Sequence, residues 1–152
     1  MAKRSKSQTE LTIKQITEEA LNQILTIGFE AMSYTTLSDA TGISRTGISH
    51  HFPKKTDFLV KLDEQISEFF VEALDFSSTE ALTTSWSSAL KKEKYQAVLK
   101  LFFSLCGYTG CKIKQFKAIS SANSQAQQSL GEDGEQCIAM LIGRAALMLM
   151  NR

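Results

Sequence analysis

The chain has little of the residues that make turns and disulfides: one proline, eight glycines and three cysteines among 152 residues. A β-sandwich or β-barrel needs many turns, so the shortage of proline and glycine argues against both. The cysteines (Cys106, Cys111 and Cys137) are odd in number, and no signal peptide precedes them. We therefore expect no secreted disulfide scaffold and predict a reducing, cytoplasmic location.

Long apolar runs are also absent. The longest, residues 138–150, is interrupted by Arg144 and is shorter than the roughly 20 residues that a membrane-spanning helix needs. Hydrophobic residues make up 43% and charged residues 22% of the chain, a balance typical of a globular protein rather than a disordered one. The sequence therefore predicts one compact domain, or two small ones, with no membrane partner.

Apolar residues recur at helical spacing through nearly the whole chain, which predicts an all-α fold. The first helix is expected over residues 9–27, with Ser7 and Glu10 at capping-box spacing and Gly28 after its end. Two short helices and then five longer ones are expected, over residues 34–41, 45–51, 55–76, 77–90, 95–107, 112–130 and 135–151, with a loop at 131–134.

The segment 33–55 has the pattern of a helix-turn-helix. Ser33 and Ser44 are placed to cap its two short helices, and Gly42 supplies the tight turn between them. Leu37 and Ile48 are expected to face inward, which leaves short or cationic hydrogen-bonding side chains outward, as recognition of a DNA groove requires. A plain helical hairpin with a polar exterior remains the alternative.

Residues 13–59 resemble the amino-terminal DNA-binding domain of TetR-type bacterial regulators. The stretch GFEAMSYTTLS (28–38) is similar to that family's first two helices, and GISRTGISHHFPKK (42–55) to its turn, recognition helix and the start of its fourth helix. Residues 32–58 are also similar in outline to short LuxT-type regulators. The resemblance implies operator contacts from Thr35, Thr36, Ser44, Arg45, Thr46, Gly47, Ser49, His50, Lys54 and Lys55, with Arg4 in a basic arm that either orders on DNA or stays a disordered tail.

Two positions depart from the family pattern. Ser49 stands where the family commonly has a tyrosine that reaches a phosphate, and serine is shorter. Gly47 lies inside the recognition helix at a helix-propensity cost of up to about 1 kcal/mol, so it either permits close approach to the groove or is simply tolerated.

The resemblance implies a helix-turn-helix domain at residues 1–53, joined by a long helix to a small helical dimerisation and ligand domain within residues 54–152. Small and apolar residues of the last helix are candidates for a dimer interface: Ala139, Ile142, Gly143 and Ala146. Aromatic and cysteine side chains are candidates for a pocket that takes an apolar effector: Trp86, Tyr95, Phe102, Phe103, Cys106 and Tyr108. For both sets, plain helical core is the alternative.

The sequence thus predicts a transcriptional regulator, a repressor that binds a palindromic operator as a homodimer and is released by a small molecule. An enzyme is not indicated, because the chain has no glycine-rich phosphate loop, no metal-ligand spacing and no nucleophile motif, and no cofactor is expected. The competing hypothesis is a helical protein–protein adaptor that has lost DNA binding.

Overall fold

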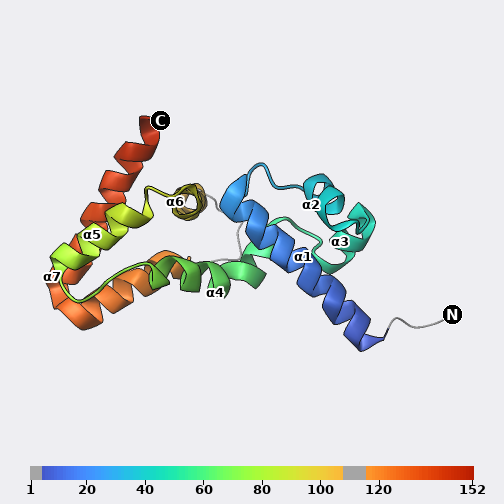
Figure 1. Ribbon diagram of the computed structural model, residues 1–152, viewed down its shortest axis with the longest axis horizontal. Coiled ribbons are helices and arrows are strands. Elements are labelled where there is room, and N and C mark those ends of the chain that lie inside the picture. Colours follow the sequence, from blue (N-terminus) through green and yellow to red (C-terminus); the bar gives the residue numbers. More distant parts are fainter. Residues whose placement is uncertain (1–4, 108–115) are drawn as a thin grey trace. The chain divides into compact units, whose positions relative to one another are not determined.

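The computed structural model describes residues 5–107 and 116–152, and within them every regular element is an α-helix (Figure 1). In chain order these are α1 (Lys6–Thr26), α2 (Tyr34–Thr41), α3 (Arg45–His51), α4 (Thr56–Glu72), α5 (Thr79–Ala89), α6 (Glu93–Cys106) and α7 (Lys117–Met150). The all-α fold predicted from the hydrophobic period is confirmed.

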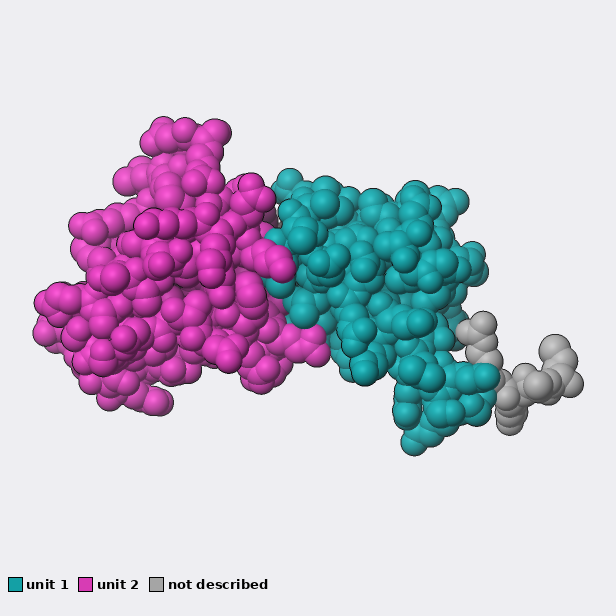
Figure 2. Space-filling view, in the orientation of Figure 1, with its two compact units in different colours: residues 1–62 teal, residues 63–152 magenta. Residues whose placement is uncertain are grey.

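The chain divides into two compact units, residues 1–62 (unit 1) and residues 63–152 (unit 2), which Figure 2 colours separately. The boundary falls inside α4, so this one helix supplies core residues to both units. In unit 1, Phe58 stacks on Phe52 with ring centroids 4.4 Å apart. In unit 2, Phe70 meets Trp86 edge to face at 5.3 Å.

α1 begins earlier than predicted. The Ser5 side chain accepts the Gln8 N–H at 3.3 Å and caps the helix, while Ser7 lies inside the first turn. The predicted cap at Ser7 is wrong, because Ser5 offers the same hydroxyl two residues earlier and the helix gains backbone hydrogen bonds by starting there. At the other end Gly28 follows the helix with a φ of +90°, where its N–H bonds the Gln23 carbonyl at 2.9 Å, as expected for a glycine C-cap.

The two short helices α2 and α3 have the predicted bounds. Ser33 caps α2 by accepting the Thr36 N–H, and Ser44 caps α3 by accepting the Gly47 N–H at 3.1 Å. Gly42 ends α2 in the left-handed conformation, with φ +73° and ψ 2°, which costs a residue with a side chain about 1 kcal/mol or more. The buried side chains of Leu37 and Ile48 hold the two helices on the core.

In unit 2, α5 was expected to begin at residue 77, but it is capped by Ser78, whose side chain accepts the Ala81 N–H at 3.0 Å. The Ser77 N–H instead bonds the Asp75 carboxylate at 2.9 Å, so Ser77 belongs to the turn that precedes the helix. Leu82 and Trp86 of α5 are buried in the core of the unit.

α7 is broken at a single glycine. Gly131 has φ +65° and ψ −145°, a conformation outside the helical region, and the chain is helical on both sides of it. The predicted four-residue loop at 131–134 is therefore wrong. The two halves run in different directions (Figure 1), and a Cβ at Gly134 would collide with the Ala126 carbonyl of the first half. The sharp break thus depends on one glycine for its backbone angle and on another for space.

Candidate nucleic-acid interface

The face of α3 that unit 1 leaves uncovered carries the predicted recognition side chains. Arg45, Thr46 and His50 are exposed, and Ser49 is half-buried. The Ser49 hydroxyl donates to the Thr46 carbonyl at 3.1 Å, which keeps this short side chain against its own helix. The groups that reach outward from α3 are therefore one guanidinium, one hydroxyl and one imidazole.

Arg45 connects the first turns of α2 and α3. Its Nη1 donates to the Thr35 hydroxyl at 3.4 Å, and both side chains are exposed. The bond is long, so the guanidinium keeps most of its donors for another acceptor. The structure places Thr35 and Arg45, ten residues apart in sequence, on one surface.

Thr36 differs from its neighbour because its hydroxyl is used inside the unit. Thr36 Oγ1 lies 2.6 Å from Gln23 Oε1 and accepts the Ser33 N–H at 2.8 Å, which completes a capping box at the start of α2. Thr35 and Thr36 were expected to act alike, and the structure gives them different surroundings.

Lys54 and Lys55 at the start of α4 also differ. Lys54 is exposed, and its backbone N–H donates to the Asp57 carboxylate at 2.9 Å. The Lys55 ammonium donates to the Glu30 carbonyl at 3.1 Å and lies 4.5 Å from the centroid of the Phe29 ring. Burial lowers the pKa of Lys55, and the nearby Glu30 charge opposes that shift. Lys55 thereby ties α4 to the turn after α1, while two of its three N–H groups are left for a further acceptor.

Gly47 has a local explanation. A Cβ at this position would lie 3.2 Å from the Ser44 hydroxyl and 3.3 Å from Ile43 Cγ2, so a side chain would press on the cap of α3. This contact is local to the cap, and it leaves both interpretations drawn from the sequence, close approach to the groove and simple tolerance, as predictions. Arg4, the remaining expected DNA contact, lies outside the described residues.

Of the six side chains expected to line one effector pocket, four fall into two aromatic clusters of unit 2. Trp86 belongs to an aromatic cluster with Phe70, and Tyr95 joins it by stacking on Phe69 at 4.5 Å. Phe102 packs instead beside Phe103 and Phe116. Cys106 is exposed, and Tyr108 lies outside the described residues.

A groove of about 510 Å³ adjoins the second cluster. It is lined by residues of α6, both halves of α7 and the residue before it: Phe102, Phe116, Ile119, Ser120, Asn123, Glu135, Ile138, Ala139 and Ile142. This groove brings one expected pocket residue, Phe102, beside two expected dimer residues, Ala139 and Ile142. The helical period within α6 or within α7 carries no signal for this contact between the two helices.

The last half of α7 exposes a larger apolar stripe than the sequence analysis identified. Of the expected dimer residues, Ala139 and Gly143 are exposed, and Ile142 and Ala146 are half-buried. Beside them Met140, Leu147 and Met150 are 44, 63 and 79% exposed. The helical spacing of these three residues was visible in the sequence, but the buried face of the same helix is equally apolar and masked it.

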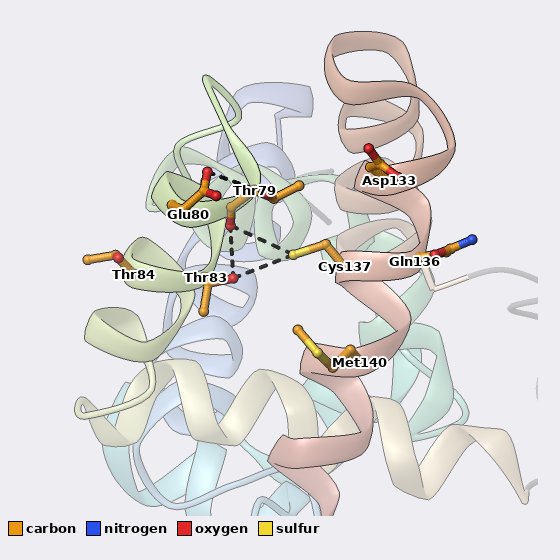
Figure 3. Close-up of a pocket in the computed structure, with 8 residues that line it drawn as sticks. All are labelled: Thr79, Glu80, Thr83, Thr84, Asp133, Gln136, Cys137 and Met140. Carbon is orange, nitrogen blue, oxygen red and sulfur yellow. Dashed lines mark hydrogen bonds between the residues drawn. The ribbon is translucent and has the colours of Figure 1, made fainter.

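A second groove, of about 670 Å³, lies between α5 and the second half of α7 (Figure 3). It is lined by Thr79, Glu80, Thr83, Thr84, Asp133, Gln136, Cys137 and Met140. The Cys137 thiol lies 3.5 Å from the Thr83 hydroxyl. Its lining holds two carboxylates and no basic side chain, so it offers nothing to nucleic acid.

Within the described ranges, no three His, Cys, Asp or Glu side chains gather as a metal site would need. In the same residues, no helix is both long and apolar enough to cross a membrane.

Comparison with models of known protein families identifies a match. The family model described as the tetracycline repressor LuxT C-terminal domain matches residues 63–149, nearly all of unit 2. No curated protein sequence matches the chain. The matched segment covers more than half of the 152 residues, and it excludes the helix-turn-helix region from which the same family was expected. The chain is thus a TetR-type transcriptional regulator and belongs to the LuxT-like family.

Proposed function

We propose that the chain is a sequence-specific DNA-binding repressor that reads a palindromic operator as a homodimer and is released from it by an apolar small molecule. The observation that carries the proposal is the geometry of α2 and α3. Leu37 and Ile48 anchor the two helices in the core, Gly42 turns the chain between them, and Arg45, Thr46 and His50 remain exposed. This is the arrangement by which a second short helix enters the major groove.

The proposed contacts are of two kinds. Arg45, Thr46 and His50 extend from α3, where they reach base edges, and Ser44, Gly47 and Ser49 line the approach of that helix. Thr35, Lys54 and Lys55 lie at helix starts and contact the phosphate backbone, which positions the protein without reading sequence. Arg4 adds a further contact from the basic arm.

We place the helix-turn-helix domain at residues 1–53 and the dimerisation and ligand domain at residues 54–152. The dimer forms through the second half of α7, where Gln136, Met140, Gly143, Leu147 and Met150 repeat in alternate steps of four and three. Such steps place side chains in one seam along a helix. Exposed Met140, Leu147 and Met150 supply apolar area, and Ala139, Gly143 and Ala146 allow the helices to approach closely.

The effector is proposed to bind in the groove at Phe102. Aromatic and aliphatic side chains cover most of its wall, while Ser120, Asn123 and Glu135 add a few polar groups, a mixture typical of small-molecule sites. Trp86 and Tyr95 do not line this groove and pack instead with Phe70 and Phe69.

The adaptor hypothesis has one observation in its favour, the short Ser49 side chain bonded to its own helix. Selection of duplexes from a randomised pool by the purified protein separates the two. The proposal predicts enrichment of an inverted repeat whose half-sites are about one helical turn apart, or a multiple of it. A pool without enrichment would favour the adaptor.

A further inference from the structure

A cluster of polar side chains lies between α1 and α2. Gln23 of α1 is 6% exposed, and its side-chain amide meets Thr36 at two points. Gln23 Nε2 donates to the Thr36 carbonyl at 3.1 Å, and Gln23 Oε1 accepts from the Thr36 hydroxyl at 2.6 Å.

The orientation of this amide is determined by its neighbours. Nε2 also donates to Glu19 Oε1 at 2.9 Å, so both of its protons are used on oxygens that only accept. The oxygen of the amide must then face the Thr36 hydroxyl. Because that hydroxyl has one proton, it donates to the nearer acceptor, Gln23, while it accepts the Ser33 N–H at 2.8 Å.

The cluster holds the start of α2 at one point on α1. α2 in turn packs on α3 through the core, and its exposed Thr35 bonds Arg45. A tilt of α2 would therefore move both the phosphate-facing turn and the recognition helix relative to α1.

We propose that Gln23 and Thr36 are a positioning pair for DNA recognition: they set the angle at which α2 and α3 are presented and do not touch the nucleic acid. This inference rests on the proposed function and divides the two adjacent threonines between two roles. Thr35 faces outward as a contact residue, and Thr36 faces inward as a positioning residue.

The test compares Thr36→Val, which keeps the shape and removes the hydroxyl, with Thr35→Val as its matched control. Binding is measured by fluorescence anisotropy on a duplex enriched by the wild-type protein and on a scrambled duplex, at a temperature where circular dichroism shows every variant folded. Thr36→Val leaves the Gln23 oxygen buried without its donor. It should lower the affinity for the enriched duplex about ten-fold and the affinity for the scrambled duplex by less. Thr36→Ser keeps the hydroxyl and should restore the binding.

Thr35→Val should lower the affinity for both duplexes equally, since a contact to the phosphate backbone of DNA carries no sequence information. A double-mutant cycle supplies the second readout. Gln23→Met removes the amide at similar length. The loss of affinity in the Thr36→Val/Gln23→Met double variant should be smaller than the sum of the two single losses, because both changes remove the same Gln23–Thr36 contact.

Three outcomes overturn the inference. Wild-type affinity in both Thr36→Val and Gln23→Met would remove the pair from DNA recognition. Additive losses, equal on both duplexes, would make Thr36 a direct backbone contact. Failure of the wild-type protein to bind any duplex would overturn the proposed function itself, and this role with it.

Discussion

The contacts that stabilise unit 1 internally differ in kind from those that stabilise unit 2. In unit 1, polar contacts join the helices and the turns between them: Gln23 with Thr36, the Tyr34 hydroxyl on the Phe52 carbonyl at 2.5 Å, and Lys55 on the Glu30 carbonyl. Unit 2 relies on aromatic and alanine packing, as in the Phe70–Trp86 pair, and on close backbone approach at Gly134. A directional contact fixes an angle, while apolar packing fixes a volume. The first suits a surface that must match a groove, and the second suits a core that supports an association face.

The largest effect is expected at the break in α7, where the two halves of the helix approach closely. Gly134→Ala places a methyl group against the Ala126 carbonyl and should lower the free energy of unfolding of unit 2 by about 3 kcal/mol. Urea unfolding followed by the fluorescence of Trp86, the chain's single tryptophan, reports this unit. Gly107→Ala is the matched control in the same unit, because nothing lies within 4 Å of its added carbon and its φ is −96°, and it should not destabilise the chain. Equal stability of the two variants would mean that the halves of α7 do not approach as described.

The apolar face of unit 2 gives the next largest effect. Light scattering at micromolar concentration should give twice the 16.9 kDa chain mass for the wild-type protein. Leu147→Asp puts a charge into the proposed seam from each copy and should weaken the dimer by at least about 2 kcal/mol. Leu11→Asp alters a comparably exposed leucine of unit 1 and should leave the dimer intact. A wild-type monomer would remove the seam from the account.

Unit 1 should separate specific from non-specific binding. Arg45→Ala should weaken the free energy of binding to an enriched duplex by about 1–3 kcal/mol and reduce the discrimination between bases at one base pair. Lys55→Ala should lower the affinity for the enriched and the scrambled duplex about equally. It should also reduce the slope of the logarithm of the binding constant against the logarithm of the salt concentration by about one unit. The reverse pattern, a salt effect from Arg45 and a sequence effect from Lys55, would exchange the two proposed roles.

The smallest effect concerns a buried carboxylate of unit 2. Asp63 accepts the Lys117 N–H at the start of α7 at 3.2 Å, and burial raises its pKa above the ordinary value, with Lys117 opposing the shift. The folded protein thus holds the Asp63 proton more tightly than the unfolded chain does. Relative to Asp63→Asn, the wild-type protein should gain stability as the pH falls from 7 through that raised pKa.

Thermal unfolding over a pH series checks the sign. Asp63→Asn should be at least as stable as wild type at pH 7, and this difference in stability between the two proteins should decrease towards pH 4. Glu64→Gln alters the neighbouring exposed ion pair with Lys117 and should change stability by no more than about 0.5 kcal/mol. If the stability of Asp63→Asn relative to wild type instead increases on acidification, the fold stabilises Asp63 as the anion.

Local chemistry made much of unit 1 predictable. Ser33, Gly42 and Ser44 each act through atoms a few residues away, so their spacing was enough to predict the bounds of α2 and α3. The inward role of Thr36 was not predictable, because its partner Gln23 is 13 residues away on another helix and an amide carries no periodic signal.

Unit 2 was less predictable because its features depend on tertiary contact. Gly131 and Gly134 together are typical of a loop, and only the packing of Gly134 on Ala126 shows why the chain instead breaks at one residue. Aromatic residues at helical spacing look alike whether they line a groove, as Phe102 does, or fill a core, as Trp86 does.

The central claim is that unit 1 reads DNA while unit 2 holds two copies together. The most direct measurement is fluorescence anisotropy of the wild-type protein on an enriched duplex over a salt series, with the stoichiometry taken from titration at high duplex concentration. We expect two chains per duplex and an association constant that falls linearly with salt on logarithmic axes. Binding of one chain per duplex, or no salt-dependent binding at all, would contradict it.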